Sequence, residues 1–536
     1  MMKCKGYIEV CIVTFLVIFS LSSTACAATY YVDAVSGSDS NAGTSQTSAW
    51  KTVAKAGSSS VKPGDVVHFK RGCTWNETLK PVSGQSGNVV SYGAYGSGNK
   101  PVISSFTATS KSYIKAQDIE FRNNSGSYPL IIDRSNHVTV QSCNIYGGAG
   151  CTVWAALRII DSDHNNVVSC DIKHMNTSKL NDCVSVKRSN YNLLEGNEMS
   201  GGVHWVVTLE ATSADYPNAT CSYNVFRNNT MTNSIAGGSL VEVQSNSSTN
   251  VFDGNMIIGG VPSGSDISNS MKIAGKNLIF RRNLIFDNSG GLGMNVSANQ
   301  YQSDPPNITT GNRVYNNTIT ETDREGITFV NHAPSVALVA DHVYKNNVIF
   351  KTNGNSCQIS WTSTNGIRDL FFHNNLIYNQ STTNVIRYLS SSYSISGIQQ
   401  NYPAIWSNNV QKDPVLDLNH KPVAGSPCID GGGFLTSVTS NSGTGSSLTV
   451  ADARYFTDGF GIVTGDTIRV GDDTAVIKKI DYANNTITLD KTVSWEKGHP
   501  VSLAYSGSRP DIGAFESGLT GIVEPQPPQT LRVASN

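Results

Sequence analysis

The sequence predicts an all-β solenoid, in which short strands coil repeatedly around one shared apolar core. An Asn-rich turn followed by an apolar-alternating strand recurs at positions 118, 144, 171, 197, 229, 255, 283, 317, 347, 375 and 409. The gaps run from 26 to 34 residues, as expected for a constant coil with loops inserted into some turns. No repeat carries a helix-period segment. A short strand pair cannot bury its apolar face alone, whereas stacked coils share a continuous core.

The amino-acid composition agrees with a solenoid and excludes other classes of protein. The 536 residues include 39 Lys+Arg and 40 Asp+Glu, so the net charge is -1 and only 15% of residues are charged. A near-neutral chain without a basic block is not a nucleic-acid binder of the usual kind. Length alone suggests three or four globular domains, but the repeat replaces them with one solenoid. Its turns are built from Asn, Ser, Thr and Gly, because columns of like charge would repel.

The N-terminus, residues 1–28, is predicted to be a signal peptide. Two lysines precede the apolar run 10–21, and Ala25-Cys26-Ala27 supplies a small-residue cleavage site. At about 12 residues the run is too short for a membrane helix, which needs about 20. We therefore expect a secreted protein, extracellular or periplasmic, without a transmembrane segment. Lipoprotein cleavage before Cys26 and an uncleaved N-terminal anchor are the alternatives.

The remaining chain is expected to contain five parts. These are an N-terminal cap with the first strands (29–100), the solenoid rungs (101–433), an inserted small β-barrel or β-sandwich (434–506), a closing solenoid motif (507–516) and a Pro-rich tail (517–536). Residues 50–56 are a short helical candidate that could cover the open end of the core, a requirement of any solenoid.

The rungs, together with two flanking motifs, resemble a known family. The opening Thr29-Tyr30-Tyr31-Val32-Asp33 and the ending Gly425-Ser426-Pro427-Cys428-Ile429-Asp430-Gly431, completed by 509–516, are similar to the start and close of secreted bacterial proteins of the right-handed parallel β-helix (pectin-lyase-like) superfamily. The resemblance implies that fold and export, but it is poorly specific for activity.

The strand that opens each rung predicts one long outward face. Apolar pairs such as Leu157/Ile159 and Val184/Val186 should point inward, so their alternates point outward. One outward column is then Arg158, Ser185, Thr208, Glu242, Lys272, and the next is Ile160, Lys187, Glu210, Gln244, Ala274. In a chain so poor in charge, this concentration is the strongest functional signal. Glu242 and Lys272 could instead be only a cross-strand ion pair.

Aromatic and acidic residues are expected beside this patch. His204 and Trp205 enter the same face, and Trp154 and Asp182 occupy nearby columns. An aromatic side chain next to a charged groove suits stacking on a sugar ring. The two tryptophans could equally pack under loops, and a structural role for His204 is favoured.

Two chemistries fit the predicted face. A lyase acting on a uronic-acid polymer needs a base for the C5 proton, for which Lys187 or Lys272 is the candidate, with Arg158 binding the carboxylate. The segment 186–190 is similar to a lysine-bearing rung of alginate and chondroitin lyases of this fold, although the next rung has no matching Arg. A glycoside hydrolase needs two carboxylates, for which Glu210 and Glu242 lie about 8 Å apart by strand spacing.

The lyase is slightly favoured, and a non-catalytic glycan-binding surface protein is the third alternative. The expected partner is an extracellular polysaccharide, and the protein is expected to be a monomer. No cofactor is required by the sequence. Ca²⁺ is a candidate, with Asp182 or the pair Asp161/Asp163 as ligands, although Asp more often caps turns.

Eight of the eleven cysteines remain after signal cleavage. The repeat stacks Cys143 against Cys170, which makes this pair the disulfide candidate in an exported protein. A ladder of buried free thiols is an equal alternative.

Overall fold

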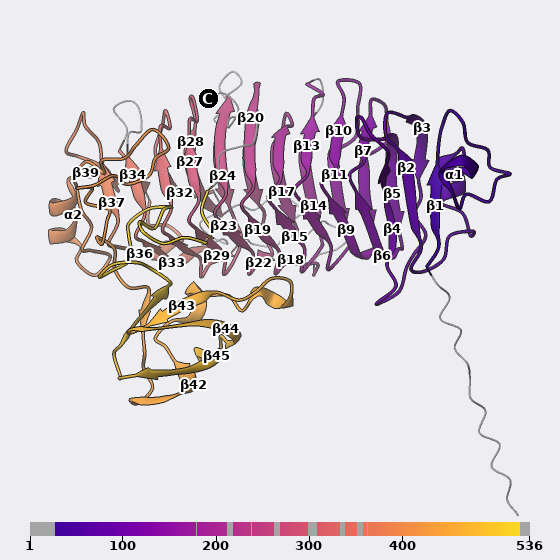
Figure 1. Cartoon of the computed structure of the whole chain (residues 1–536). Helices are drawn as coiled ribbons and strands as arrows, with labels where there is room; N and C mark the ends of the chain where they lie inside the picture. Colours follow the sequence, from indigo (N-terminus) through magenta and orange to yellow (C-terminus); the bar gives the residue numbers. More distant parts are fainter. Residues whose placement is uncertain are drawn as a thin grey trace, which may run out of the picture.

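The computed structural model describes residues 27–177, 180–211, 218–236, 238–261, 268–298, 308–332, 338–350, 357–361, 363–521 and 523–525. The predicted signal peptide therefore lies almost wholly outside the described residues, as does the end of the Pro-rich tail. Within them the chain forms the predicted parallel β-helix, whose strands follow one another along a single long axis (Figure 1).

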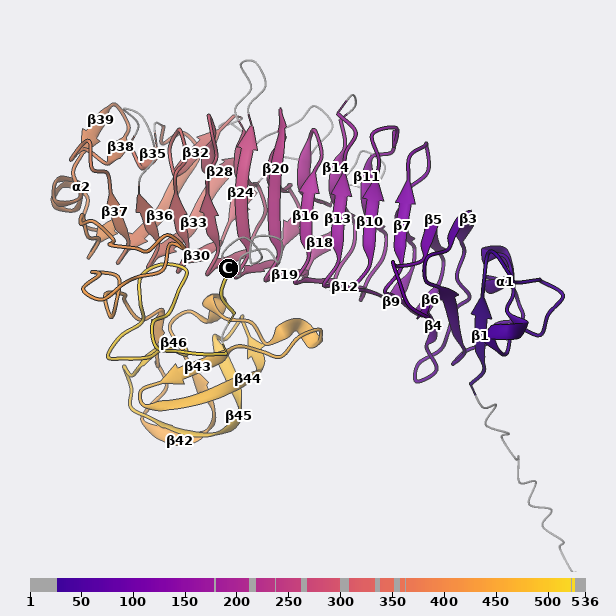
Figure 2. The same ribbon diagram turned by 45° about the horizontal axis from the view of Figure 1, so that its top comes forward.

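Each coil contributes one strand to each of three faces, and Figure 2 shows successive strands stacked side by side. The first face comprises β1 (Thr29–Val32), β2 (Val66–Lys70), β4 (Val90–Tyr95), β6 (Ser112–Gln117), β9 (Asn136–Gln141), β12 (Asn166–Val168), β15 (Leu193–Glu195), β19 (Val225–Arg227), β23 (Val251–Asp253), β26 (Ile279–Arg281), β30 (Arg313–Tyr315), β33 (Leu338–Lys345), β36 (Ile367–His373) and β40 (Trp406–Ser407).

The second face follows each first-face strand after a tight turn. It comprises β7 (Glu120–Asn123), β10 (Asn144–Gly147), β13 (Asp171–His174), β16 (Glu198–Gly201), β20 (Thr230–Ala236), β24 (Met256–Val261), β27 (Leu284–Phe286), β31 (Thr318–Thr320), β34 (Val348–Phe350) and β37 (Leu376–Tyr378).

The third face completes each coil. It comprises β8 (Leu130–Asp133), β11 (Ala155–Ile160), β14 (Asp182–Lys187), β17 (Trp205–Glu210), β21 (Ser239–Val243), β25 (Asn269–Ile273), β28 (Leu292–Ala298), β32 (Ile327–Asn331), β35 (Ile359–Trp361) and β38 (Ile386–Tyr388). The short strands β3 (Thr74–Leu79), β5 (Val102–Thr109), β18 (Cys221–Ser222), β22 (Ser247–Ser248), β29 (Ile308–Thr310) and β39 (Ser391–Tyr393) complete the coils and their ends.

The predicted Asn turns form a buried hydrogen-bonded ladder between the first and second faces. Each side-chain amide donates to the next Asn Oδ1 at 2.9–3.0 Å, along Asn197, Asn229, Asn255, Asn283, Asn317, Asn347, Asn375 and Asn409. The residue before each Asn, such as Asn228 at φ 54°, is left-handed, a conformation that Asn and Gly tolerate best. The ladder thereby satisfies turn groups that would otherwise be buried without partners.

The first rungs of this ladder differ from the prediction by one residue. Cys170 N donates to Asn197 Oδ1 at 2.9 Å, so Cys143 and Cys170 occupy the ladder positions predicted for residues 144 and 171. Both cysteines are free and buried, and each thiol lies near backbone carbonyls at 3.4–3.7 Å. Both thiols thus line the core, because cysteine fills a small buried position as a hydrophobic residue does, and the disulfide between them stays a prediction.

The apolar core runs the length of the solenoid and is closed at both ends. Stacked rings such as Phe226, Phe252 and Phe280 lie 4.9 Å apart between centroids. Near the N-terminus α1 (Val53–Ala56), the 3-10 turn η1 (Gln46–Ser48) and the buried Trp50 cover the open end. The helix α2 (Ile395–Asn401) packs with Ile395 and Ile398 at the other end.

The inserted segment forms a separate six-stranded antiparallel sheet, which lies against one side of the C-terminal half of the solenoid (Figure 1). It comprises β41 (Thr436–Ser437), β42 (Gly443–Thr449), β43 (Thr467–Val470), β44 (Asp473–Asp481), β45 (Thr486–Trp495) and β46 (Pro500–Leu503), with turns η2 (Ala453–Tyr455) and η3 (Gly459–Gly461).

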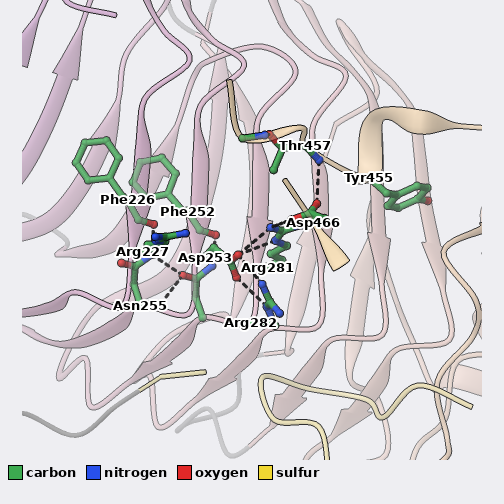
Figure 3. Close-up of polar contacts among 12 residues, drawn as sticks. Phe226, Arg227, Phe252, Asp253, Asn255, Arg281, Arg282, Tyr455, Thr457 and Asp466 are labelled. Carbon is green, nitrogen blue, oxygen red and sulfur yellow. Dashed lines mark hydrogen bonds and ion pairs between the residues drawn. The ribbon is translucent and has the colours of Figure 1, made fainter. Parts of the chain in front are cut away.

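A buried ionic cluster holds this sheet to the solenoid (Figure 3). Arg281 on β26 donates two hydrogen bonds of 2.6 Å to Asp466, which precedes β43, and also pairs with Asp253 at 2.8 Å. A second link joins Arg313 to Asp452 at 2.7 Å. Asp253, Asp466 and the Tyr315 hydroxyl surround Arg281, so its buried charge is paired and hydrogen-bonded.

No helix in the described part of the chain is long and apolar enough to cross a membrane.

Candidate functional site

The third face carries the predicted outward columns in the predicted register. Arg158 pairs with Ser185, Ser185 with Thr208, Thr208 with Glu242 and Glu242 with Lys272. Lys187 pairs with Glu210 in the next column. The alternate residues, including Leu157 and Val184, are fully buried in the core. Period-two alternation along each strand produces this arrangement.

Alternation is interrupted once near the start of these strands. Two consecutive residues face the core in each, as Ala156–Leu157, Cys183–Val184 and Val206–Val207 do. Asp182, which precedes such a pair, lies close enough to Thr208 and Glu242 for both to act on the pKa of its carboxyl. The interruption therefore joins Asp182 to the charged columns, a contact that strict alternation would not predict.

Both lysines of the face are paired with carboxylates. Lys272 Nζ lies 2.8 Å from Glu242 Oε1, and Lys187 contacts Glu210 in the same way. Glu242 is buried, and its other oxygen accepts a hydrogen bond from Gln244 Nε2 at 2.8 Å. The predicted ion pair of Glu242 and Lys272 is thus present. Lys187 and Lys272 lie three strands apart, about 14 Å by strand spacing.

Arg158 differs from the lysines, because its partner is a hydroxyl group. Its Nη1 donates to the Tyr128 hydroxyl at 2.6 Å, and its Nε is buried without a hydrogen bond. Among the described residues no carboxylate pairs with it. Its guanidinium also lies 5.6 Å from the Tyr128 ring centroid, so the aromatic ring helps to fix it. Arg158 is therefore held on the face with capacity to bind an anion.

His204 bridges Asp182 and Trp205. Its Nδ1 lies 3.0 Å from Asp182 Oδ1, and the Trp205 indole N–H donates to its Nε2 at 3.1 Å. Nε2 must then be the acceptor, so the proton of the neutral ring lies on Nδ1 and is donated to Asp182.

Opposing effects set the pKa values of this pair. Burial lowers the pKa of His204, but the hydrogen bond and charge of Asp182 outweigh it, so the pKa is raised. Burial raises the pKa of Asp182, and the nearby charge of Glu242 adds to this, whereas His204 lowers it only in part. Asp182 Oδ2 and Thr208 Oγ1 are both buried without a hydrogen-bond partner.

Trp154 lies at the edge of this cluster. Its side chain is 46% exposed, and its ring lies 6.4 Å from that of His204 in an edge-on arrangement. Trp205 is buried, and its indole supports His204 from within the protein. The two tryptophans therefore differ: Trp154 presents an accessible surface and Trp205 does not.

Some residues of the face escaped the sequence prediction. Asn295 continues the outward column beyond Lys272, and extension of the strand alignment by one rung would have found it. Tyr128 lies in the loop before β8, where no motif marks it. His332 follows β32, and the charge of Lys272 lowers its pKa, second to burial.

The arrangement does not fit the candidate Ca²⁺ site. No group of three or more His, Cys, Asp or Glu side chains within the described residues could hold a metal ion. Asp161 pairs with Arg188 at 2.6 Å, and Asp163 Oδ1 accepts the Asn190 N–H at 2.7 Å, so both tie neighbouring rungs together. Asp182 gives one oxygen to His204, whereas Ca²⁺ requires six to eight oxygen ligands.

The chain is similar in part to enzymes that act on glycans. No family model matches the chain. A lacto-N-biosidase from Bifidobacterium longum subsp. longum is 35% identical over 91 residues, which is 16% of this chain and 6% of that protein. The chain thus spans a small fraction of this curated relative.

Two solved structures are similar to this chain over most of its length. A PL6 family polysaccharide lyase from Pseudopedobacter saltans is 15% identical with a TM-score of 0.48, over 70% of this chain and 94% of that one. A GH136 lacto-N-biosidase from Eubacterium ramulus is 14% identical with a TM-score of 0.41, over 67% and 65%. At this level of similarity neither structure assigns a role to this chain, and the site must be argued from this chain's own residues.

Proposed function

We propose that the protein is a secreted carbohydrate-active β-helix that binds a uronic-acid polysaccharide along its third face and cleaves it by β-elimination. One observation carries this proposal. Arg158 lies in the first outward column, and among the described residues it has no carboxylate partner, while Lys187 and Lys272 of the same face pair with Glu210 and Glu242. A substrate carboxylate is the natural partner for a fixed guanidinium.

The residues then divide the chemistry as follows. Arg158 binds the C6 carboxylate, which stabilises the charge that develops when C5 loses its proton. Lys187 releases its proton to solvent and, as a neutral amine, takes the C5 proton. The C4–O4 bond breaks, a C4–C5 double bond forms, and the leaving oxygen takes a proton from the Tyr128 hydroxyl beside Arg158. Trp154 offers an apolar ring for a neighbouring sugar.

Glycoside hydrolysis is the second candidate, and Asp182 favours it. Burial raises the pKa of Asp182, which suits a general acid, while Glu242 nearby is ion-paired to Lys272. Paired carboxylates in contrasting environments are the usual arrangement of a glycosidase. In this scheme Asp182 protonates the leaving oxygen and Glu242 activates water.

Product analysis separates these candidates. The protein is incubated with alginate, pectate and chondroitin, with and without added Ca²⁺. Rising ultraviolet absorbance from unsaturated products supports the lyase, and reducing ends without that absorbance support the hydrolase. Retention in an affinity gel without either product supports a glycan-binding protein. No turnover and no retention would refute the proposal.

Two variants test the face itself. Lys187→Ala should lower kcat for elimination by about 100-fold or more, since it removes the general base. Glu242→Ala should reduce hydrolysis in the same manner. Lys173→Ala is the matched control, because Lys173 pairs with Asp171 on the second face. Full turnover in both Lys187→Ala and Glu242→Ala would exclude this face as the active site.

A further inference from the structure

A groove of about 780 Å³ lies on the second face, away from the charged columns of the third. Its floor is formed by three outward aromatic side chains at the ends of β27, β34 and β37: Phe286, Phe350 and Tyr378. Phe350 and Tyr378 lie on adjacent strands in direct register, and Thr320 separates Phe350 from Phe286. The three rings therefore span about 14 Å by strand spacing, long enough for a short oligosaccharide.

The loop 413–423 forms the opposite wall and is held by its own hydrogen bonds. Asp417 Oδ1 accepts the backbone N–H groups of Asn419 and Lys421 at 2.8 and 2.9 Å. His420 packs against Phe286 with ring centroids 4.8 Å apart. Leu418 projects from this wall and is 99% exposed. The groove is thus pre-formed, which lowers the entropic cost of binding.

The groove is acidic, whereas on the third face each lysine is balanced by a carboxylate and Arg158 is not. Glu321, Asp413 and Asp417 line it, and no Lys or Arg does among the described residues. Carboxylates accept hydrogen bonds from hydroxyl groups, but they repel a polyanion. Aromatic rings bury the apolar face of a flat ligand while its edge stays hydrated. These two features together match a sugar that carries hydroxyl groups and no negative charge.

We propose that this groove is a second carbohydrate site, which takes an uncharged oligosaccharide. The sugar rings lie on Phe350 and Tyr378, and their hydroxyl groups donate to Glu321 and to the acidic loop. This site is independent of the function proposed for the third face: it holds the protein on a neutral glycan while the third face acts on a charged one. The volume is within the usual range of ligand sites.

Calorimetric titration of the full-length protein tests the site directly. The probes are neutral hexasaccharides of the cello-, xylo- and manno-series, with a guluronate hexamer as the anionic comparison. We expect at least one neutral hexamer to bind at millimolar concentration or below, and the guluronate hexamer to leave the groove empty. Tyr378→Ala should weaken neutral binding by about tenfold, whereas Tyr378→Phe should preserve it.

Controls separate a lost site from a damaged fold and from the third face. Leu418→Ser changes a fully exposed side chain, so it should weaken binding without altering thermal unfolding. Tyr191→Ala removes an outward ring from a different corner of the coil and should leave binding unchanged. Arg158→Met should abolish turnover of the uronic-acid polymer and leave neutral binding intact.

Three results would overturn the second site. They are absence of binding by all three neutral hexamers, equal affinity in wild type and a folded Tyr378→Ala variant, and competition of the guluronate hexamer for the same site. None of these bears on turnover at the third face, so failure of either proposal can be recognised without the other.

Discussion

His204 Nδ1 lies 3.0 Å from Asp182 Oδ1 and links β14 to the turn before β17. The indole of Trp205 occupies the other ring nitrogen at 3.1 Å. With both nitrogens engaged, His204 is not poised to take a proton from substrate. It positions the Asp182 carboxyl beside Glu242 and the charged columns instead, in line with the structural role favoured for it from the sequence.

Asp182→Asn should lower the pKa of His204. The hydrogen bond and charge of Asp182 are what raise this pKa against the effect of burial, so their removal leaves burial to favour the neutral ring. Nuclear magnetic resonance titration of the imidazole protons measures the change. Asp171→Asn, on the second face, is the control and should have no effect. An unchanged or higher pKa in Asp182→Asn would contradict the assigned pairing.

Trp205→Phe should have the opposite effect. The indole N–H donates to Nε2, which stabilises the neutral ring, and a phenyl ring of related shape removes that donor. The imidazolium then pairs with Asp182 without a facing donor, and the pKa of His204 rises further. The same titration tests this. A fall in the pKa would mean that the indole does not donate to Nε2.

Asn255→Ala should destabilise the solenoid strongly. Its amide donates to Asn283 Oδ1 and to the Phe226 carbonyl, both at 2.9 Å, in a fully buried turn. Loss of these bonds leaves buried polar groups without partners and should cost about 3 kcal/mol. Urea unfolding followed by circular dichroism measures the midpoint. Asn136→Ala, at an exposed position, should change it little, and equal midpoints for both variants would refute the role of the ladder.

The fold was largely predictable because the strands of a parallel β-helix follow a local sequence pattern, the alternation of inward apolar and outward residues. Each strand alternates with period two, so the outward order from Arg158 to Lys272 followed directly from the inward apolar pairs. The ladder register was harder, because Cys143 and Cys170 replace Asn, and the adjacent Asn144 suggested the wrong anchor by one residue. Asp182 was expected beside the charged columns, and it reaches Glu242, although strict alternation would point it inward, because two consecutive core residues follow it.

Contacts between distant segments were beyond sequence reasoning. Arg281 meets Asp466 across 185 residues, and nothing in either local pattern identifies the partner. The Arg158 contact to Tyr128 depends on the path of a loop. Such pairs depend on how the loops and the inserted sheet pack against the solenoid. No repeating sequence pattern encodes this packing.

Thiol counting tests the free state of the cysteines. The eight described cysteines are all free and buried, so alkylation of a protein that lacks residues 1–27 should add eight groups after denaturation without reductant and almost none before it. Mass spectrometry counts the additions. Six additions, with Cys143 and Cys170 protected until reduction, would establish the disulfide in their place.

Asp466→Ala should loosen the inserted sheet from the solenoid. This substitution removes two 2.6 Å hydrogen bonds to Arg281 and the 2.8 Å bond from Thr457 N, all buried. Breaking a buried ion pair from one side costs about 3–5 kcal/mol when the remaining charge is left alone, and a smaller loss is expected here because Arg281 keeps a second carboxylate. Asp253 still pairs with Arg281 at 2.8 Å, so the solenoid itself should stay folded.

Limited proteolysis measures this release. Cleavage near residues 434 and 507 should be faster in Asp466→Ala than in wild type, while the solenoid core resists digestion. Asp472→Ala, at a fully exposed position on the same inserted sheet, should be digested at the wild-type rate. If Asp466→Ala also resists cleavage, the apolar contacts of the sheet, such as Tyr455 against Tyr315 at 5.6 Å, are sufficient to hold it.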